Sequence, residues 1–255
     1  MAYQRSIPIL VPLSVWLLCQ LVLWRSDFLF LAISWGTLII TLGVKYIFSV
    51  NKSDWPLFLT APLLFFFSFL AYATIIINRP LIHFIFLTIL LFLFFFFRNL
   101  YYYSLKVEPN RAGTYTNQLK ETIFIGGNLS VFAGSAFLFG LPAFLNLSII
   151  YLLLMMGVMI VLSYIQTIIG FGLAWSKIGR LFLINALLTV ELAAVLYLLP
   201  LNFNIIALFL GVFYFLGITI IYLFAHDNFN RHSFKGPLTL GVVVIVILLF
   251  SSRWL

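Results

Sequence analysis

The stretch from Leu81 to Phe97 contains no Asp, Glu, Lys or Arg and would be apolar on every side of a helix. Inside a bilayer every backbone amide needs a partner within the protein, so such a segment forms either a helix or a strand of a closed barrel. Barrel strands are about ten residues long and alternate between polar and apolar residues. Because this stretch has no period of two, the sequence predicts membrane-spanning α-helices.

The composition shows that the rest of the chain follows the same pattern. Of the 255 residues, 64% are hydrophobic and 8% are charged, whereas soluble domains carry about 25% charged residues. Charged and turn residues divide the chain into nine apolar segments, of which the last is the shortest. These segments are 7–24, 28–48, 57–77, 81–97, 122–144, 147–173, 181–199, 205–225 and 238–251. We therefore expect an all-α, polytopic membrane bundle of eight or nine helices, forming a single transmembrane domain without a soluble domain.

The chain holds 30 phenylalanines, and several of them gather in the tracts 65–67 and 94–97. These tracts are typical of low-complexity sequence and do not form a motif. We expect them to face the lipid.

The distribution of the 14 Lys and Arg residues predicts the orientation. If the N-terminus and the even-numbered connections share one side of the membrane, all but Arg25, Arg79 and Arg253 lie on that side. Lys and Arg accumulate in cytoplasmic loops. We therefore expect a cytoplasmic N-terminus and, with nine spans, an external C-terminus in the inner or plasma membrane of the cell. The same rule accounts for the net charge of +8 and favours the lipid bilayer, not nucleic acid, as the partner.

The longest polar stretch, residues 98–121, is expected to form a basic interfacial loop on the cytoplasmic side. It contains four cations that are candidates for contacts with an anion or a lipid headgroup, namely Arg98, Lys106, Arg111 and Lys120. Basic segments beside a membrane attract anionic lipid. The loop could act as a docking or active-site loop, or it could be a linker that only maintains topology, and we favour the linker.

Glu191 is the one acidic residue inside the predicted spans. It lies about 11 residues into the segment 181–199, which at 1.5 Å per residue places it roughly 16 Å deep, near the bilayer midplane. An ionised acid at this depth costs about 2.5–3.5 kcal/mol on insertion scales. Two interpretations stay open: a proton or cation relay that could also recognise a cationic group, or a glutamate that helps two helices to pack.

Several amides interrupt the fifth, sixth and seventh segments, among them Asn128, Gln166 and Asn185. Asn128 and Gln166, with hydroxyls such as Ser135 and Ser163, could line a polar cleft together with Glu191. Helical geometry turns Asn185 about 120° away from Glu191, so these two are not obvious partners on their own helix. The alternative is that they form hydrogen bonds between helices, each worth about 0.6 kcal/mol. We favour this second interpretation.

The sequence shows no pattern for a metal, a cofactor or familiar catalytic chemistry. Cys19 is the single cysteine, and the three histidines are too widely separated in the predicted topology to converge. P-loop, HExxH and GxSxG patterns do not occur in the sequence. We expect neither a cofactor nor a metal, and an enzyme is disfavoured. Three classes of function stay open: a small transporter or membrane-assembly protein that works with membrane partner subunits; an enzyme acting on a lipid-linked substrate through residues 98–121; and a non-catalytic scaffold of a membrane complex. We favour the first class.

Overall fold

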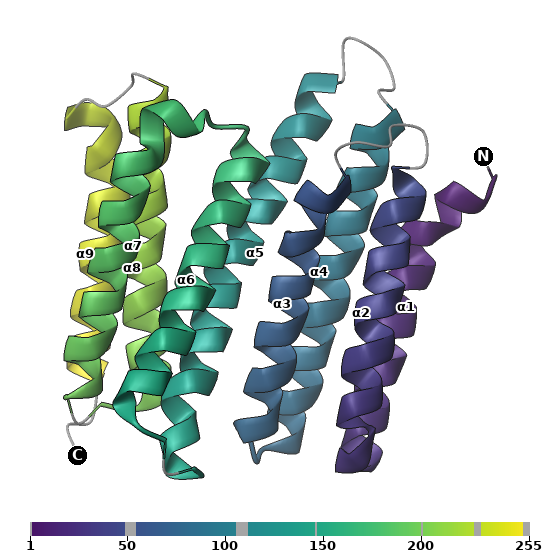
Figure 1. The fold of residues 1–255 in the computed structure, drawn as a ribbon, viewed down its shortest axis with the longest axis horizontal. Helices are drawn as coiled ribbons and strands as arrows, with labels where there is room; N and C mark the ends of the chain where they lie inside the picture. The colour runs from purple at the N-terminus through teal and green to yellow at the C-terminus, as the bar shows by residue number, and fades with distance from the viewer. Residues whose placement is uncertain are drawn as a thin grey trace. The chain divides into compact units, whose positions relative to one another are not determined.

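The computed structural model describes residues 2–48, 55–105, 112–145, 147–199, 201–226 and 231–251. These residues form nine α-helices and two short 3-10 turns, and they include no strand (Figure 1). The helices are α1 (Ala2–Trp24), α2 (Leu29–Ile47), α3 (Trp55–Ile75), α4 (Arg79–Leu105), α5 (Ala112–Gly140), α6 (Ile149–Phe171), α7 (Trp175–Tyr197), α8 (Phe203–Ala225) and α9 (Arg231–Ser251). The turns are η1 (Ser26–Phe28) and η2 (Leu141–Ala143).

The helices confirm the predicted fold class. By length and composition, 8 of them are able to cross a membrane, whereas the apolar part of α9 is the shorter stretch Phe234–Ile247. The prediction of eight or nine spans, with the last as the shortest, agrees with this result. The protein is an all-α bundle of apolar helices.

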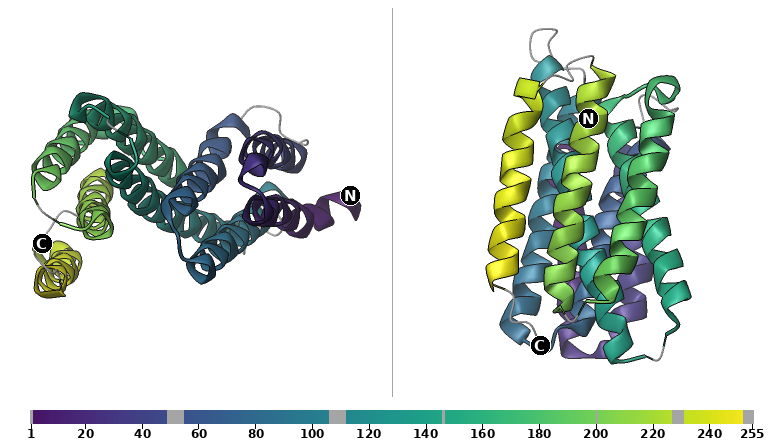
Figure 2. Two further views of the ribbon diagram at one scale, coloured as in Figure 1. Left: turned by 90° about the horizontal axis from the view of Figure 1, so that it is seen from below. Right: turned by 90° about the vertical axis from the view of Figure 1, so that its left-hand side faces the viewer.

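The chain divides into two compact units, residues 1–127 (unit 1) and 128–255 (unit 2). In unit 1, α1 packs against α2 and α4, and α3 packs against the same two helices. In unit 2, the helices α6, α7, α8 and α9 pack in chain order, each against the next. Within each unit the helices run side by side (Figure 2).

The expectation that the phenylalanine tracts face lipid is wrong for four of their seven residues. Phe65, Phe66, Phe96 and Phe97 are completely buried in unit 1. Glycines make room for two of these rings: a Cβ at Gly36 would lie only 2.6 Å from the ring of Phe66, and one at Gly43 would lie 2.9 Å from the ring of Phe97. Because glycine has no side chain, each ring packs directly onto the α2 backbone.

The stretch 98–121 is also different from the expected loop. The helix α4 continues to Leu105 and α5 begins at Ala112, so both ends of the stretch are helical. The reason is that the core of unit 1 extends past the predicted end of the span, where Leu100 and Leu119 are buried. Asn99 ties the two helices together, because its Nδ2 donates to Thr122 Oγ1 at 2.8 Å.

Candidate functional site

A cluster of buried polar side chains lies where α6, α7 and α8 meet in unit 2. Its centre is the Tyr214 hydroxyl of α8, which donates to the Ser163 carbonyl oxygen at 2.9 Å and lies 2.7 Å from Thr167 Oγ1, both on α6. The side chains of all three residues are completely buried. These contacts join α6 to α8 in the middle of the helices.

The second half of the cluster joins α6 to α7. The Tyr164 hydroxyl lies 3.5 Å from Thr189 Oγ1. Thr189 donates to the carbonyl oxygen of Asn185 at 2.6 Å, and Asn185 Nδ2 donates to the Leu181 carbonyl oxygen at 2.9 Å. Asn185, one of the predicted site residues, is therefore a buried member of this cluster.

Gly217 allows α8 to approach the cluster closely. A Cβ at this position would overlap the Tyr164 hydroxyl and would lie 3.0 Å from Asn185 Oδ1. Tyr164, Tyr214 and Gly217 were not among the predicted site residues. The sequence feature that could have identified the tyrosines is their depth in the predicted spans. Tyrosine in membrane helices is enriched at the interfaces, whereas Tyr214 lies at the centre of α8.

Gln166 lies on α6, one turn from Ser163, and is only 2% exposed. Neither its Nε2 nor its Oε1 has a hydrogen-bond partner among the residues that the structure describes. An unpaired buried amide costs about 1–3 kcal/mol. Gln166 is thus the predicted site residue whose polar atoms the protein leaves unsatisfied.

Asn128 and Ser135 lie on α5. Asn128 is half-buried. Ser135 is completely buried, and its hydroxyl donates to Met156 Sδ of α6 at 3.5 Å. The α5–α6 contact is therefore a second polar contact of unit 2.

Glu191 lies on the opposite side of α7 from the cluster. Thr189 is buried, whereas Glu191 is exposed together with Leu187, Leu188 and Val195. Within the described part of the chain the carboxylate makes no hydrogen bond or ion pair. Glu191 follows Arg180 by 11 positions, about 16 Å along the helix. Asn185 is buried and Glu191 is exposed, so the two lie on different faces of α7, as the helical geometry predicts.

Of the four residues predicted to contact an anion, the structure describes two. Arg98 of α4 is exposed and Lys120 of α5 is half-buried. The contact between Asn99 and Thr122 shows that they lie at the same end of unit 1. Lys106 and Arg111 fall outside the described residues.

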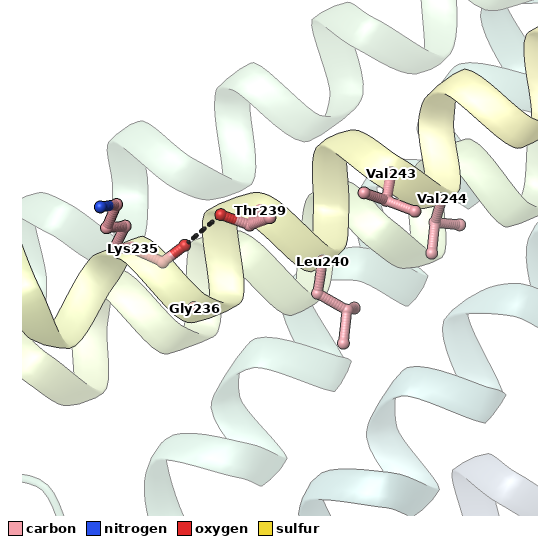
Figure 3. Close-up of a pocket in the computed structure, with 6 residues that line it drawn as sticks. All are labelled: Lys235, Gly236, Thr239, Leu240, Val243 and Val244. Atoms are coloured by element: carbon pink, nitrogen blue, oxygen red, sulfur yellow. Dashed lines mark hydrogen bonds between the residues drawn. The ribbon is translucent and has the colours of Figure 1, made fainter.

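An open hollow on α9 is lined by six residues of that one helix (Figure 3): Lys235, Gly236, Thr239, Leu240, Val243 and Val244. The Thr239 hydroxyl donates to the Lys235 carbonyl oxygen at 2.8 Å, and the ammonium of Lys235 is the charged group among these six residues. Nowhere in the described ranges do three His, Cys, Asp or Glu residues gather as metal ligands.

Comparison of this chain with protein-family models, curated proteins and solved structures found no match.

Proposed function

We propose that this protein is a subunit of a membrane assembly, and that α7 binds a membrane helix of a partner protein through Glu191. The observation that carries the proposal is the position of this carboxylate, which is exposed on an aliphatic helix face about 16 Å from Arg180. In lipid an acidic side chain is costly and is normally paired. A partner helix would supply the missing hydrogen bond or charge.

The pattern of the exposed face supports a helix as the partner. The exposed residues Ile184, Leu188, Glu191, Val195 and Leu198 follow one another at alternating intervals of four and three. This is the spacing by which two helices interlock along a left-handed seam. Left-handed packing of this kind is the commonest arrangement in membrane bundles.

Charge complementarity supports a basic side chain on that partner helix. A symmetric contact between two copies of α7 would place Glu191 against Glu191. The Lys and Arg residues of the described part of unit 2 all lie in the first two turns of α7 and α9, so this part of a second copy offers no cation at the depth of Glu191. A Lys or Arg in the middle of a partner's helix would fit, because an oppositely charged pair lowers the cost of each charge in lipid.

The polar cluster supports packing more than transport. The hydroxyls of Tyr214 and Thr167 bond to each other. The hydroxyls of Tyr214 and Thr189 also bond to backbone carbonyl oxygens. Such bonds hold helices together and leave fewer groups to bind a passing solute. The buried amide of Gln166, which has no described hydrogen-bond partner, instead favours a polar path through unit 2.

Site-specific photocrosslinking in cells tests the assembly. A photoreactive amino acid at Leu188 or Val195 should crosslink to one partner, whereas the same probe at Leu154, an exposed residue of α6, should not. Glu191→Leu should abolish the crosslink, and Glu191→Gln should weaken it because an amide keeps the hydrogen bond but loses the charge.

Identification of the partner completes the test. Its crosslinked helix should carry a Lys or Arg near the midplane, and exchanging the two charges between Glu191→Lys and the partner's basic residue should restore the crosslink. Crosslinks to a second copy of this chain, or equal crosslinks at Leu154, would contradict the proposal.

A further inference from the structure

A cavity of about 400 Å3 lies at one end of unit 1, where the α1–α2 and α3–α4 connections meet. The end of α1, η1 and the beginning of α2 form one wall. The end of α3 and the first two turns of α4 form the other. This is the end of unit 1 opposite to Arg98 and Lys120.

Two arginines line this cavity, Arg25 after α1 and Arg79 at the start of α4. Both are exposed, and neither forms an ion pair with any residue in the ranges that the structure describes. No Asp or Glu lines the cavity. The first turn of α4 has no acidic residue either, although the positive end of a helix dipole favours a negative charge. The described lining therefore carries two cations and no acid, with Asp27 of η1 as an exposed neighbour of Arg25 in the sequence.

The deeper lining is apolar. Leu70, Ala73 and Phe86 line the cavity and are nearly completely buried. Guanidinium groups bind phosphate and carboxylate with paired hydrogen bonds, whereas apolar walls accept hydrocarbon. One ligand that satisfies both halves is an anionic head joined to an acyl chain.

The position of the two arginines in the sequence supports the same conclusion. Arg25, Arg79 and Arg253 are the only basic residues on the predicted external side of the membrane. The positive-inside rule disfavours basic residues on that side. The fold brings two of these three residues to one cavity, which gives them a common role.

We infer that this cavity binds an anionic amphiphile, with Arg25 and Arg79 holding its phosphate or carboxylate head and α1, α3 and α4 holding the chain. The inference does not depend on the assembly proposed for α7. Both residues belong to unit 1, so a ligand here acts independently of Glu191.

Native mass spectrometry of the purified protein in detergent tests this site. Phosphatidylglycerol and oleate serve as probes with the two kinds of head, phosphatidylcholine as the lipid without net charge, and inorganic phosphate as the head alone. We expect at least one of the two anionic probes to bind, and neither of the other two to bind comparably. The double variant Arg25→Gln/Arg79→Gln should bind at least about ten-fold more weakly, whereas Arg180→Gln, which changes an exposed arginine outside the cavity, should bind normally.

Two further variants distinguish binding of the ligand's anionic head from binding of its acyl chain. Arg25→Lys/Arg79→Lys keeps the charge and should retain part of the binding if the protein is folded. Thr74→Trp places a large ring at an exposed residue of the lining and should reduce binding with both arginines intact. Equal binding by the double Gln variant, by phosphatidylcholine or by phosphate alone would overturn the inference.

Discussion

Thr189 and Glu191 stand two positions apart on α7 and face opposite environments, since Thr189 is completely buried and Glu191 is exposed. Successive residues of a helix are rotated by about 100°, so two positions turn a side chain to the other half of the surface. The consequence is a division of roles on one helix. The inner face of α7 bonds to α6 and packs against α8, whereas the outer face is exposed.

This division predicts opposite effects for two substitutions on α7. Thr189→Val keeps the shape of the side chain but removes its hydrogen bonds, and it should destabilise the isolated protein by about 0.6 kcal/mol. Glu191→Leu should cause no loss of stability in the same protein, because the carboxylate bonds to no described residue. Unfolding in mixed detergent measures both values. A marked loss of stability in Glu191→Leu would show that the carboxylate has a partner within this chain.

Tyr214→Phe removes one hydroxyl from the contact between α6 and α8. The Ser163 carbonyl oxygen and the Thr167 hydroxyl each lose a partner, so we expect a loss of about 0.6–1.5 kcal/mol. Tyr222→Phe is the matched control on the same helix, since the Tyr222 ring packs on His226 at 4.3 Å between centroids but its hydroxyl bonds to no described residue. Thermal unfolding should separate the two variants, and equal midpoints would contradict a structural role for the hydroxyl.

Gly217→Ala should destabilise unit 2, because the added methyl group overlaps the Tyr164 hydroxyl. Overpacking of this kind costs about 1–3 kcal/mol. Gly179→Ala is the control, since a Cβ at that position of α7 meets no atom within 4 Å, and the better helix propensity of alanine should stabilise by up to about 1 kcal/mol. The two substitutions should therefore shift the unfolding midpoint in opposite directions.

The helices could be predicted from the sequence because the bilayer allows so few alternatives. Apolar length and interrupting charges locate each span, and all nine predicted segments overlap helices of the structure. The stretch 98–121 was misassigned because polarity was taken to mark a loop. A helix that leaves the membrane keeps its own hydrogen bonds, and Leu100 and Leu119 continue the buried core there.

The site could be predicted only in part, because helical periodicity relates residues of one helix but not residues of different helices. The geometry of α7 correctly separated Asn185 from Glu191. The bond between Tyr214 and Thr167 joins residues 47 positions apart, and the cavity of Arg25 and Arg79 joins two separate connections. Such pairings depend on which helices are neighbours, a property that one sequence does not encode locally.

The predicted orientation leads to a labelling experiment in unit 1. Cys19 is buried, and replacing it with alanine provides a background without cysteine. In intact cells a charged maleimide should label Ile77→Cys, a position that is 90% exposed in wild type, but should not label Asn117→Cys at the opposite end of the unit. After permeabilisation both should react. Labelling of both variants in intact cells would contradict the predicted topology.

Gln166→Met tests whether the unsatisfied amide has a function. Methionine has a similar shape and needs no hydrogen bond, so relief of the buried amide should stabilise the protein by about 1 kcal/mol. Gln118→Met, at an exposed residue of α5, should have almost no effect. If Gln166 only packs, the stabilised variant should keep the crosslink at Leu188 and grow normally in cells that depend on the protein. A stabilised and correctly assembled variant that fails to support growth would show that the amide binds a solute, and it would favour a polar path through unit 2.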